Sequence, residues 1–176
     1  RASGAGEAKM SGLGEVRILV VDDNAQMREI MAAVLTAAGV RRLTFAPDAK
    51  TGLERLRSLQ VDVIYVDYEM PRMNGLDFIA AVRALPGDQG MTPIIMLTGH
   101  ADVAHLNAAR DRGVNEFLAK PVTARNILAR LESVIYRPRN FVKCTTYFGP
   151  DRRRRAHPNY SGPLRRSEDN PAMLEL

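Results

Sequence analysis

Acidic residues, one hydroxyl and one lysine directly follow or end short apolar runs along the first two thirds of the chain. Asp22 and Asp23 follow one run, Asp67 ends another, and Thr98 and Lys120 end two more. Three carboxylates that lie close together repel one another unless a cation sits among them. Mg²⁺, or Mn²⁺ in its place, suits such a group because it binds a few carboxylates and keeps waters that phosphoryl oxygens can replace. The pattern therefore predicts a divalent-cation site, with Thr98 and Lys120 beside it to contact a phosphoryl group.

Each of these residues alone also has an ordinary explanation. A single aspartate at the end of a strand is usually solvated or caps a helix, and either Asp23 or Asn24 could cap the helix that follows. The functional interpretation depends on all the residues meeting in one place.

The elements that must bring them together alternate regularly between strand and helix. Five apolar or β-branched runs are each followed by a helical pattern; the first helix carries its apolar stripe from Met27 to Leu35 and the last from Ile127 to Ile135. Such units predict an α/β fold with a parallel sheet covered by helices on both faces. Ligands of such sheets bind beyond the carboxyl ends of the strands. We expect strands at 16–21, 43–46, 61–66, 93–97 and 116–119, and intervening helices at 48–59, 76–85 and 102–112.

Four sequence strings within residues 16–136 resemble a known family. The strings ILVVDDNAQMREIM, VDVIYVDYEMPRMNGLDFI, PIIMLTG and FLAKP are similar to those of receiver domains in bacterial two-component response regulators, with the chemotaxis regulators as the single-domain comparison. The resemblance implies a flavodoxin-like, doubly wound (βα)5 fold with strand order 2-1-3-4-5. It also implies a phospho-accepting signalling domain that catalyses only its own phosphorylation and dephosphorylation.

The resemblance further assigns roles around the acidic residues. Asp67 would accept the phosphoryl group from a histidine kinase or a histidine phosphotransferase. Asp23 and Asp67 would bind the metal directly, Asp22 would act through water, and the backbone carbonyl of Glu69 would be another ligand. The chain would then signal to a downstream protein.

The same resemblance names residues that would transmit the phosphorylated state. Lys120 would pair with phosphoryl oxygens, and the Lys120–Pro121 peptide bond would be cis. Thr98 would move toward the phosphoryl group and Phe117 would turn inward behind it, so that two existing states change in population. The alternative is that Phe117 is only a core residue of its strand.

Composition limits the domain organisation. With 45% hydrophobic and 26% charged residues, the chain has the make-up of a globular protein with one main core. The single Cys144 excludes an internal disulfide, and no apolar run is long enough to span a membrane, so we predict a cytoplasmic protein. We expect residues 1–14 to be a flexible segment or expression remnant, 15–136 to be the receiver, and 137–176 to be a basic tail without its own core.

The tail carries all of the net charge of +5, because residues 137–176 hold nine Lys or Arg and four Asp or Glu. Its near-repeat, YFGPDRR and YSGPLRR, combines aromatic residues with arginine. Three interpretations stay open: a solvated charge run, an arm that binds a partner protein or a second copy in a homodimer, and a nucleic-acid or membrane surface. The tail contacts would come from Phe141, Tyr147, Phe148, Arg152, Arg153, Arg154, Arg155 and Tyr160.

Two functions from different classes follow. The first is a stand-alone response regulator that signals by phosphorylation-dependent protein contacts. The second is the receiver part of a nucleic-acid-directed regulator, whose effector is the basic tail or a further C-terminal domain. A helix-turn-helix would require helical periodicity that residues 137–176 lack.

Overall fold

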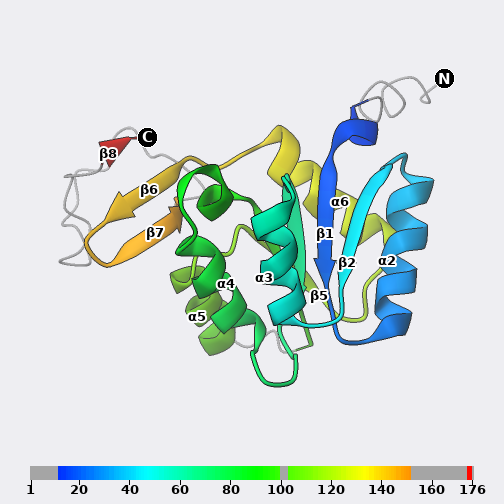
Figure 1. The fold of residues 1–176 in the computed structure, drawn as a ribbon, viewed down its shortest axis with the longest axis horizontal. Helices are drawn as coiled ribbons and strands as arrows, with labels where there is room; N and C mark the ends of the chain where they lie inside the picture. The colour runs from blue at the N-terminus through cyan, green and yellow to red at the C-terminus, as the bar shows by residue number, and fades with distance from the viewer. Residues whose placement is uncertain (1–11, 100–102, 152–173, 176) are drawn as a thin grey trace.

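The computed structural model describes residues 12–99, 103–151 and 174–175, and their centre is a five-stranded parallel sheet (Figure 1). The strand order is β2-β1-β3-β4-β5, so the chain reverses its direction of winding between β1 and β3. The strands are β1 (Arg17–Val21), β2 (Arg42–Ala46), β3 (Val63–Asp67), β4 (Ile94–Thr98) and β5 (Glu116–Ala119).

Helices connect the strands, and polar side chains cap several of them. Asn24, Asp48, Asn74 and Thr123 each accept a hydrogen bond from the backbone N–H three residues later, as N-cap residues do. The helices are η1 (Leu13–Glu15), α2 (Ala25–Ala37), α3 (Ala49–Ser58), α4 (Gly75–Arg83), η2 (Gly87–Met91), α5 (Val103–Asp111) and α6 (Ala124–Tyr136).

Apolar side chains on the two faces of the sheet form two cores. Helices α2 and α6 cover one face, with Met31, Leu35 and Leu131 packed against it. Helices α3, α4 and α5 cover the other, where Leu56 and Phe78 are fully buried. Strands β3 and β4 are buried along their whole length, which explains their continuous apolar sequences. The predicted fold and strand order are confirmed.

A hairpin beyond α6 (Figure 1) packs against Gly90 and Gly113, which come shortly before β4 and β5. It consists of β6 (Phe141–Cys144) and β7 (Tyr147–Pro150), and β6 also pairs with β8 (Leu174–Glu175). The contact is close: a Cβ added to Gly149 would lie 2.9 Å from the Cα atom of Gly113. The helical pattern places the end of the receiver at residue 136, and the sequence after it does not predict this hairpin.

Beneath the hairpin lies Arg83, which is only 8% exposed. Its guanidinium donates hydrogen bonds to the backbone oxygens of Gly90, Thr92 and Gly113 and to the side chain of Asn115. The Phe141 ring covers it, with its centroid 5.0 Å from the Arg83 Cζ atom. Burial lowers the pKa of Arg83 to about 10, so it remains a cation at neutral pH. The hairpin therefore closes off a buried charge.

None of the helices in the described part of the chain has the length and apolar character needed to cross a membrane.

Candidate functional site

The carboxyl ends of β1 and β3 bring the predicted acidic residues together. Asp22 and Asp67 are 1% and 3% exposed, whereas Asp23 is exposed. One carboxylate oxygen from each of the three residues lies within 4.8 Å of the others. Two segments that are distant in sequence thus form one acidic cup, at the strand ends where ligand sites of such sheets occur.

Lys120 reaches into this cup from the end of β5. Its Nζ atom lies 2.8 Å from Asp67 Oδ1, and its side chain is 27% exposed. The backbone N–H of Lys120 donates to the backbone oxygen of Thr98, which ends β4 and is 3% exposed. The Lys120–Pro121 peptide bond is cis. The structure therefore places the lysine against the carboxylate and the threonine beside the lysine.

Burial makes the two inner carboxylates unusually weak acids. The pKa of Asp22 is raised to about 6, first because of burial and also because Asp67 is near, although the Asn24 N–H lowers it. Burial likewise raises the pKa of Asp67, while the hydrogen bond and charge of Lys120 act in the opposite direction. A cation placed among these groups would favour their charged forms.

Two residues that follow β1, Asn24 and Arg28, hold Asp22 in place by hydrogen bonds. The N–H of Asn24 donates to Asp22 Oδ1 at 2.9 Å, and Arg28 Nη1 donates to the backbone oxygen of Asp22 at 2.7 Å. Asn24 also caps α2, accepting from the N–H of Met27. The cap that the sequence left open between two residues is thus Asn24, and Asp23 is available for another role.

The segment after β3 approaches the site so closely that it requires a glycine. A Cβ added to Gly75 would lie 2.5 Å from the backbone oxygen of Asp67 and 2.9 Å from Tyr68 Cα. The Gly75 N–H donates to the Tyr68 oxygen, which draws the start of α4 onto the strand end. Gly75 belongs to the motif that carries the family resemblance, but its role here was not predicted; the Asn-Gly pair before a helical pattern is the sequence signal for it.

The donor set fits a hard divalent cation. Each of the three aspartates offers a carboxylate oxygen, and Asp22 Oδ2 is buried with no hydrogen-bond partner among the described residues. A buried oxygen without a partner is costly unless a ligand or water meets it. Mg²⁺ or Mn²⁺ therefore suits the acidic cup formed by Asp22, Asp23 and Asp67.

The other residues predicted from the sequence lie outside the three aspartates of the acidic cup. The backbone N–H of Glu69 bonds to Asp67, while the Glu69 side chain is exposed. Phe117 lies in β5, half-buried and packed against the core under α3, α4 and α5. Tyr147 and Phe148 lie in β7 on the hairpin. Residues 152–155 and Tyr160 lie outside the described residues.

Comparison with known proteins agrees with this geometry. The model of the response regulator receiver domain matches residues 18–132. The probable chemotaxis protein CheY of Rhizobium etli is 32% identical over 71% of this chain and 96% of its own length. The DNA-binding response regulator MtrA of Mycobacterium tuberculosis is also 32% identical, over 69% of this chain and 51% of its own length.

A solved structure gives the same result for the fold. The high-resolution structure of the Vibrio cholerae chemotaxis response regulator CheY4 has a TM-score of 0.64 at 30% identity, covering 68% of this chain and 98% of the other. The match to the receiver model spans every residue of the acidic cup together with Thr98 and Lys120. The chain belongs to the response regulator receiver family of two-component signalling.

Proposed function

We propose that this chain accepts a phosphoryl group on Asp67 from a phosphohistidine of a histidine kinase or phosphotransferase, and signals through protein contacts that depend on phosphorylation. The observation that carries the proposal is the position of the Asp67 carboxylate, which is buried between Lys120 and two further aspartates. Such a carboxylate is shielded from solvent and lies next to a cationic side chain that can offset the charge of a phosphoryl group.

The proposed step forms one bond and breaks one. An Asp67 Oδ atom attacks phosphorus while the phosphorus–nitrogen bond of phosphohistidine breaks, and the bonding electron pair leaves with the imidazole nitrogen, which takes up a proton. The product is an acyl phosphate on Asp67. Because the nucleophile is already an anion, this step needs positioning and charge neutralisation rather than a base.

Lys120 and Thr98 supply part of that neutralisation. The Lys120 ammonium lies against Asp67 Oδ1 and would offset the charge on the phosphoryl oxygens; the Thr98 hydroxyl would donate to one of them. Asp22, Asp23, Asp67 and the backbone carbonyl of Glu69 would hold Mg²⁺. When bound, the ion neutralises charge shared by the carboxylates and the phosphoryl group.

The phosphorylated state would be transmitted through β5. Thr98 would move toward the phosphoryl group and the half-buried Phe117 would turn into the space behind it. Phe117 pairs with Met96 in the β4–β5 ladder, and Thr98 pairs with Ala119 two residues further along. Phe117 and Thr98 therefore lie near each other at the carboxyl ends of these strands. A downstream protein would recognise the resulting surface.

The test uses phosphoramidate, which has a phosphorus–nitrogen bond like that of phosphohistidine, and intact-mass spectrometry. The wild-type chain should gain one phosphoryl group when Mg²⁺ is present and none with a chelator. Asp67→Asn should gain none, whereas Asp88→Asn, a matched change at an exposed residue of η2, should behave as the wild type does. Phosphorylation of the Asp67→Asn protein at the wild-type rate would refute the proposal.

A second candidate function is favoured by the similarity to MtrA, which is named as a DNA-binding response regulator. In that case this chain is the receiver part of a nucleic-acid-directed regulator, and the basic residues after 137 or a further domain contact the nucleic acid. Binding of a DNA duplex to the full chain, with an affinity that falls steeply with salt, would support it. Equal binding after replacement of all four residues Arg152 to Arg155 by serine would argue against the tail as effector.

A further inference from the structure

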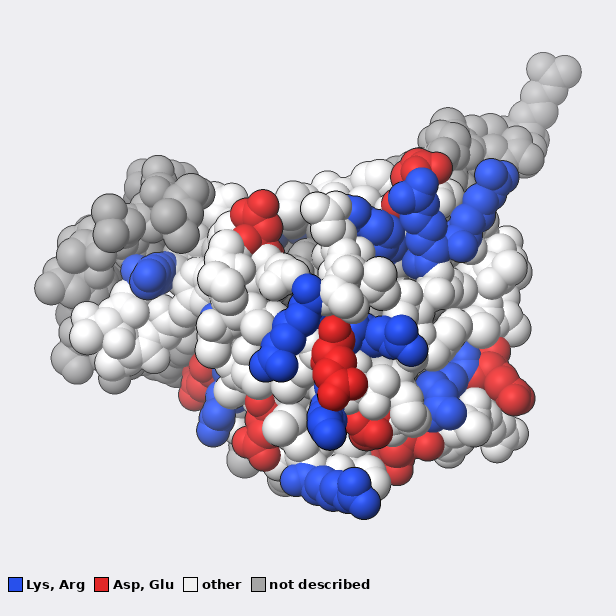
Figure 2. Space-filling view, viewed as in Figure 1, with Lys and Arg blue, Asp and Glu red and all other residues white. Residues whose placement is uncertain are grey.

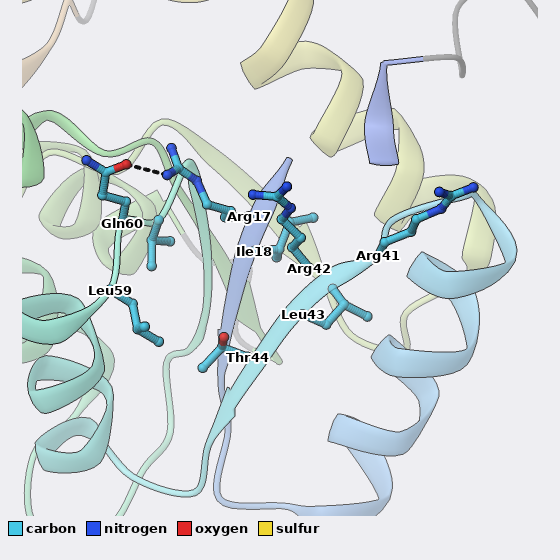
Figure 3. A pocket seen from close by; sticks show the side chains of 9 residues that line it. Arg17, Ile18, Arg41, Arg42, Leu43, Thr44, Leu59 and Gln60 are labelled. Atoms are coloured by element: carbon cyan, nitrogen blue, oxygen red, sulfur yellow. Dashed lines mark hydrogen bonds between the residues drawn. The ribbon is translucent and has the colours of Figure 1, made fainter. Parts of the chain in front are cut away.

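A cavity of about 250 Å³ opens at the end of the sheet opposite to the acidic cup, where β1 and β2 begin. Its walls combine apolar and basic side chains. Figure 3 shows the guanidinium groups of Arg17, Arg42 and Arg41 spread across the beginnings of β1 and β2, with Thr44 and Leu59 on the α3 side of β2 and Leu43 turned toward α2. The complete lining consists of Arg17, Ile18, Arg41, Arg42, Leu43, Thr44, Leu59, Gln60 and Val61.

The three arginines are held in different ways. Arg17 is fixed by Asp62, with Nη2 to Oδ1 at 2.7 Å and Nε to Oδ2 at 2.9 Å, and also donates to Gln60. Arg42 forms an ion pair with Glu15, in which the side chains are 55% and 81% exposed. Arg41 has no ion-pair partner among the described residues. Exposed pairs contribute little stability, so Arg41 and Arg42 can be redirected toward an incoming anion at small cost.

Basic side chains dominate the surface around this cavity. Figure 2 shows Lys and Arg side chains gathered over the beginnings of β1 and β2, with acidic atoms among them. An apolar side chain, Leu59, is 42% exposed beside them. Arginine next to exposed aliphatic surface is the composition of a protein-binding site rather than of a purely solvated face.

The cavity also includes the first residues of the edge strand, β2, together with the start of its inner neighbour, β1. β2 is the outermost strand of the sheet, so its outer edge has no neighbouring strand in the described part of the chain. Four consecutive residues, 41–44, line the cavity. An extended peptide could therefore follow β2 while placing a side chain into the cavity.

We propose that this cavity binds an acidic, extended segment of a partner protein, with one aliphatic side chain inserted beside Leu59 and carboxylates on Arg41 and Arg42. The site lies at the opposite ends of the strands from Asp67. Docking there is therefore independent of the phosphoryl site, and it gives the chain a second, constitutive contact with a partner.

The experiment uses the unphosphorylated full chain and a capped peptide of six acidic residues around one central leucine. Amide resonances are followed by ¹H–¹⁵N NMR. Shifts should cluster at Leu43, Thr44, Gln60 and Val61, and Asp67→Asn should bind the peptide with the same Kd. The expected Kd for the Arg41→Glu, Arg42→Glu double variant is at least about tenfold weaker.

Matched controls separate this site from general attraction between opposite charges. Lys50→Glu with Lys143→Glu makes the same change in net charge at two exposed positions outside the cavity and should change the Kd less than twofold. A peptide with serine in place of leucine should bind more weakly, and Leu59→Ser should have a parallel effect, which covers the case in which the arginine variant does not fold.

Three results would overturn the proposal. The first is that no shifts appear at the cavity. The second is that the control pair weakens binding as much as the arginine pair does. The third is that inorganic phosphate or a DNA duplex shifts the same amides at the same concentration as the leucine peptide, which would show an unselective anion surface.

Discussion

Replacing Asp22 by asparagine should stabilise the metal-free protein at neutral pH, although it removes a residue of the functional site. Asp22 is 1% exposed and its pKa is raised to about 6 from 3.8, chiefly by burial. Asparagine retains an oxygen that can accept the Asn24 N–H bond now made to Oδ1. The substitution therefore removes a buried charge while keeping its main hydrogen bond.

The magnitude follows from proton linkage. The folded chain holds the Asp22 proton more tightly than the unfolded chain, so the group favours folding below pH 3.8, and this contribution is lost as the pH rises through about 6. A rise from 3.8 to about 6 corresponds to about 3 kcal/mol. Asp22→Asn should therefore raise the free energy of unfolding at pH 7.5 by up to about 3 kcal/mol when no divalent cation is present.

Urea unfolding with a chelator, measured between pH 4 and 8, provides the assay. The advantage of Asp22→Asn over the wild type should grow with pH up to about 6 and then level off, and added Mg²⁺ should reduce it by stabilising the wild type more than the variant. Asp62→Asn is a control of opposite sign, because the Arg17 hydrogen bond lowers the pKa of Asp62. A pH-independent difference, or a variant less stable than the wild type at pH 7.5, would refute this reasoning.

Two further substitutions test how the site and the hairpin are supported. Gly75→Ala should lower the free energy of unfolding in urea by about 1–3 kcal/mol and slow phosphorylation by phosphoramidate, because the added Cβ would push against the Asp67 backbone oxygen. An unchanged phosphorylation rate would show that this close approach does not matter for the site. Phe141→Ala should lower the free energy of unfolding by about 1–2 kcal/mol without changing the Mg²⁺ affinity, because it uncovers Arg83 at the other end of the sheet. Val142→Ala, at the neighbouring residue of β6, is the control. An equal loss of unfolding free energy in that variant would show that covering Arg83 with the Phe141 ring contributes nothing specific.

The sequence predicted the site through the ends of its strands. Apolar runs ending at Asp22, Asp67 and Thr98 are sufficient to place those residues at one edge of a parallel sheet, because the strand order brings these ends together. Local sequence could not distinguish the burial of the adjacent residues Asp22 and Asp23. That difference depends on Asn24 and Arg28 turning the chain after β1.

Local sequence patterns could not predict the hairpin or the basic cavity, for a similar reason. Strands β6 and β7 are four residues long, too short for a clear alternating pattern, and they are positioned by Arg83 and Gly113 from other parts of the chain. Arg41 and Arg42 look like ordinary surface residues until β1, β2 and the segment after α3 are assembled around them. Both features depend on tertiary contacts.

Chemical mapping of the phosphorylated residue tests the central claim most directly. Borohydride reduces an acyl phosphate on aspartate to homoserine, so a chain treated with phosphoramidate and Mg²⁺ should carry homoserine at position 67 in tandem mass spectra. Homoserine at another aspartate, or a stable phosphoryl group on a histidine or serine, would contradict the account.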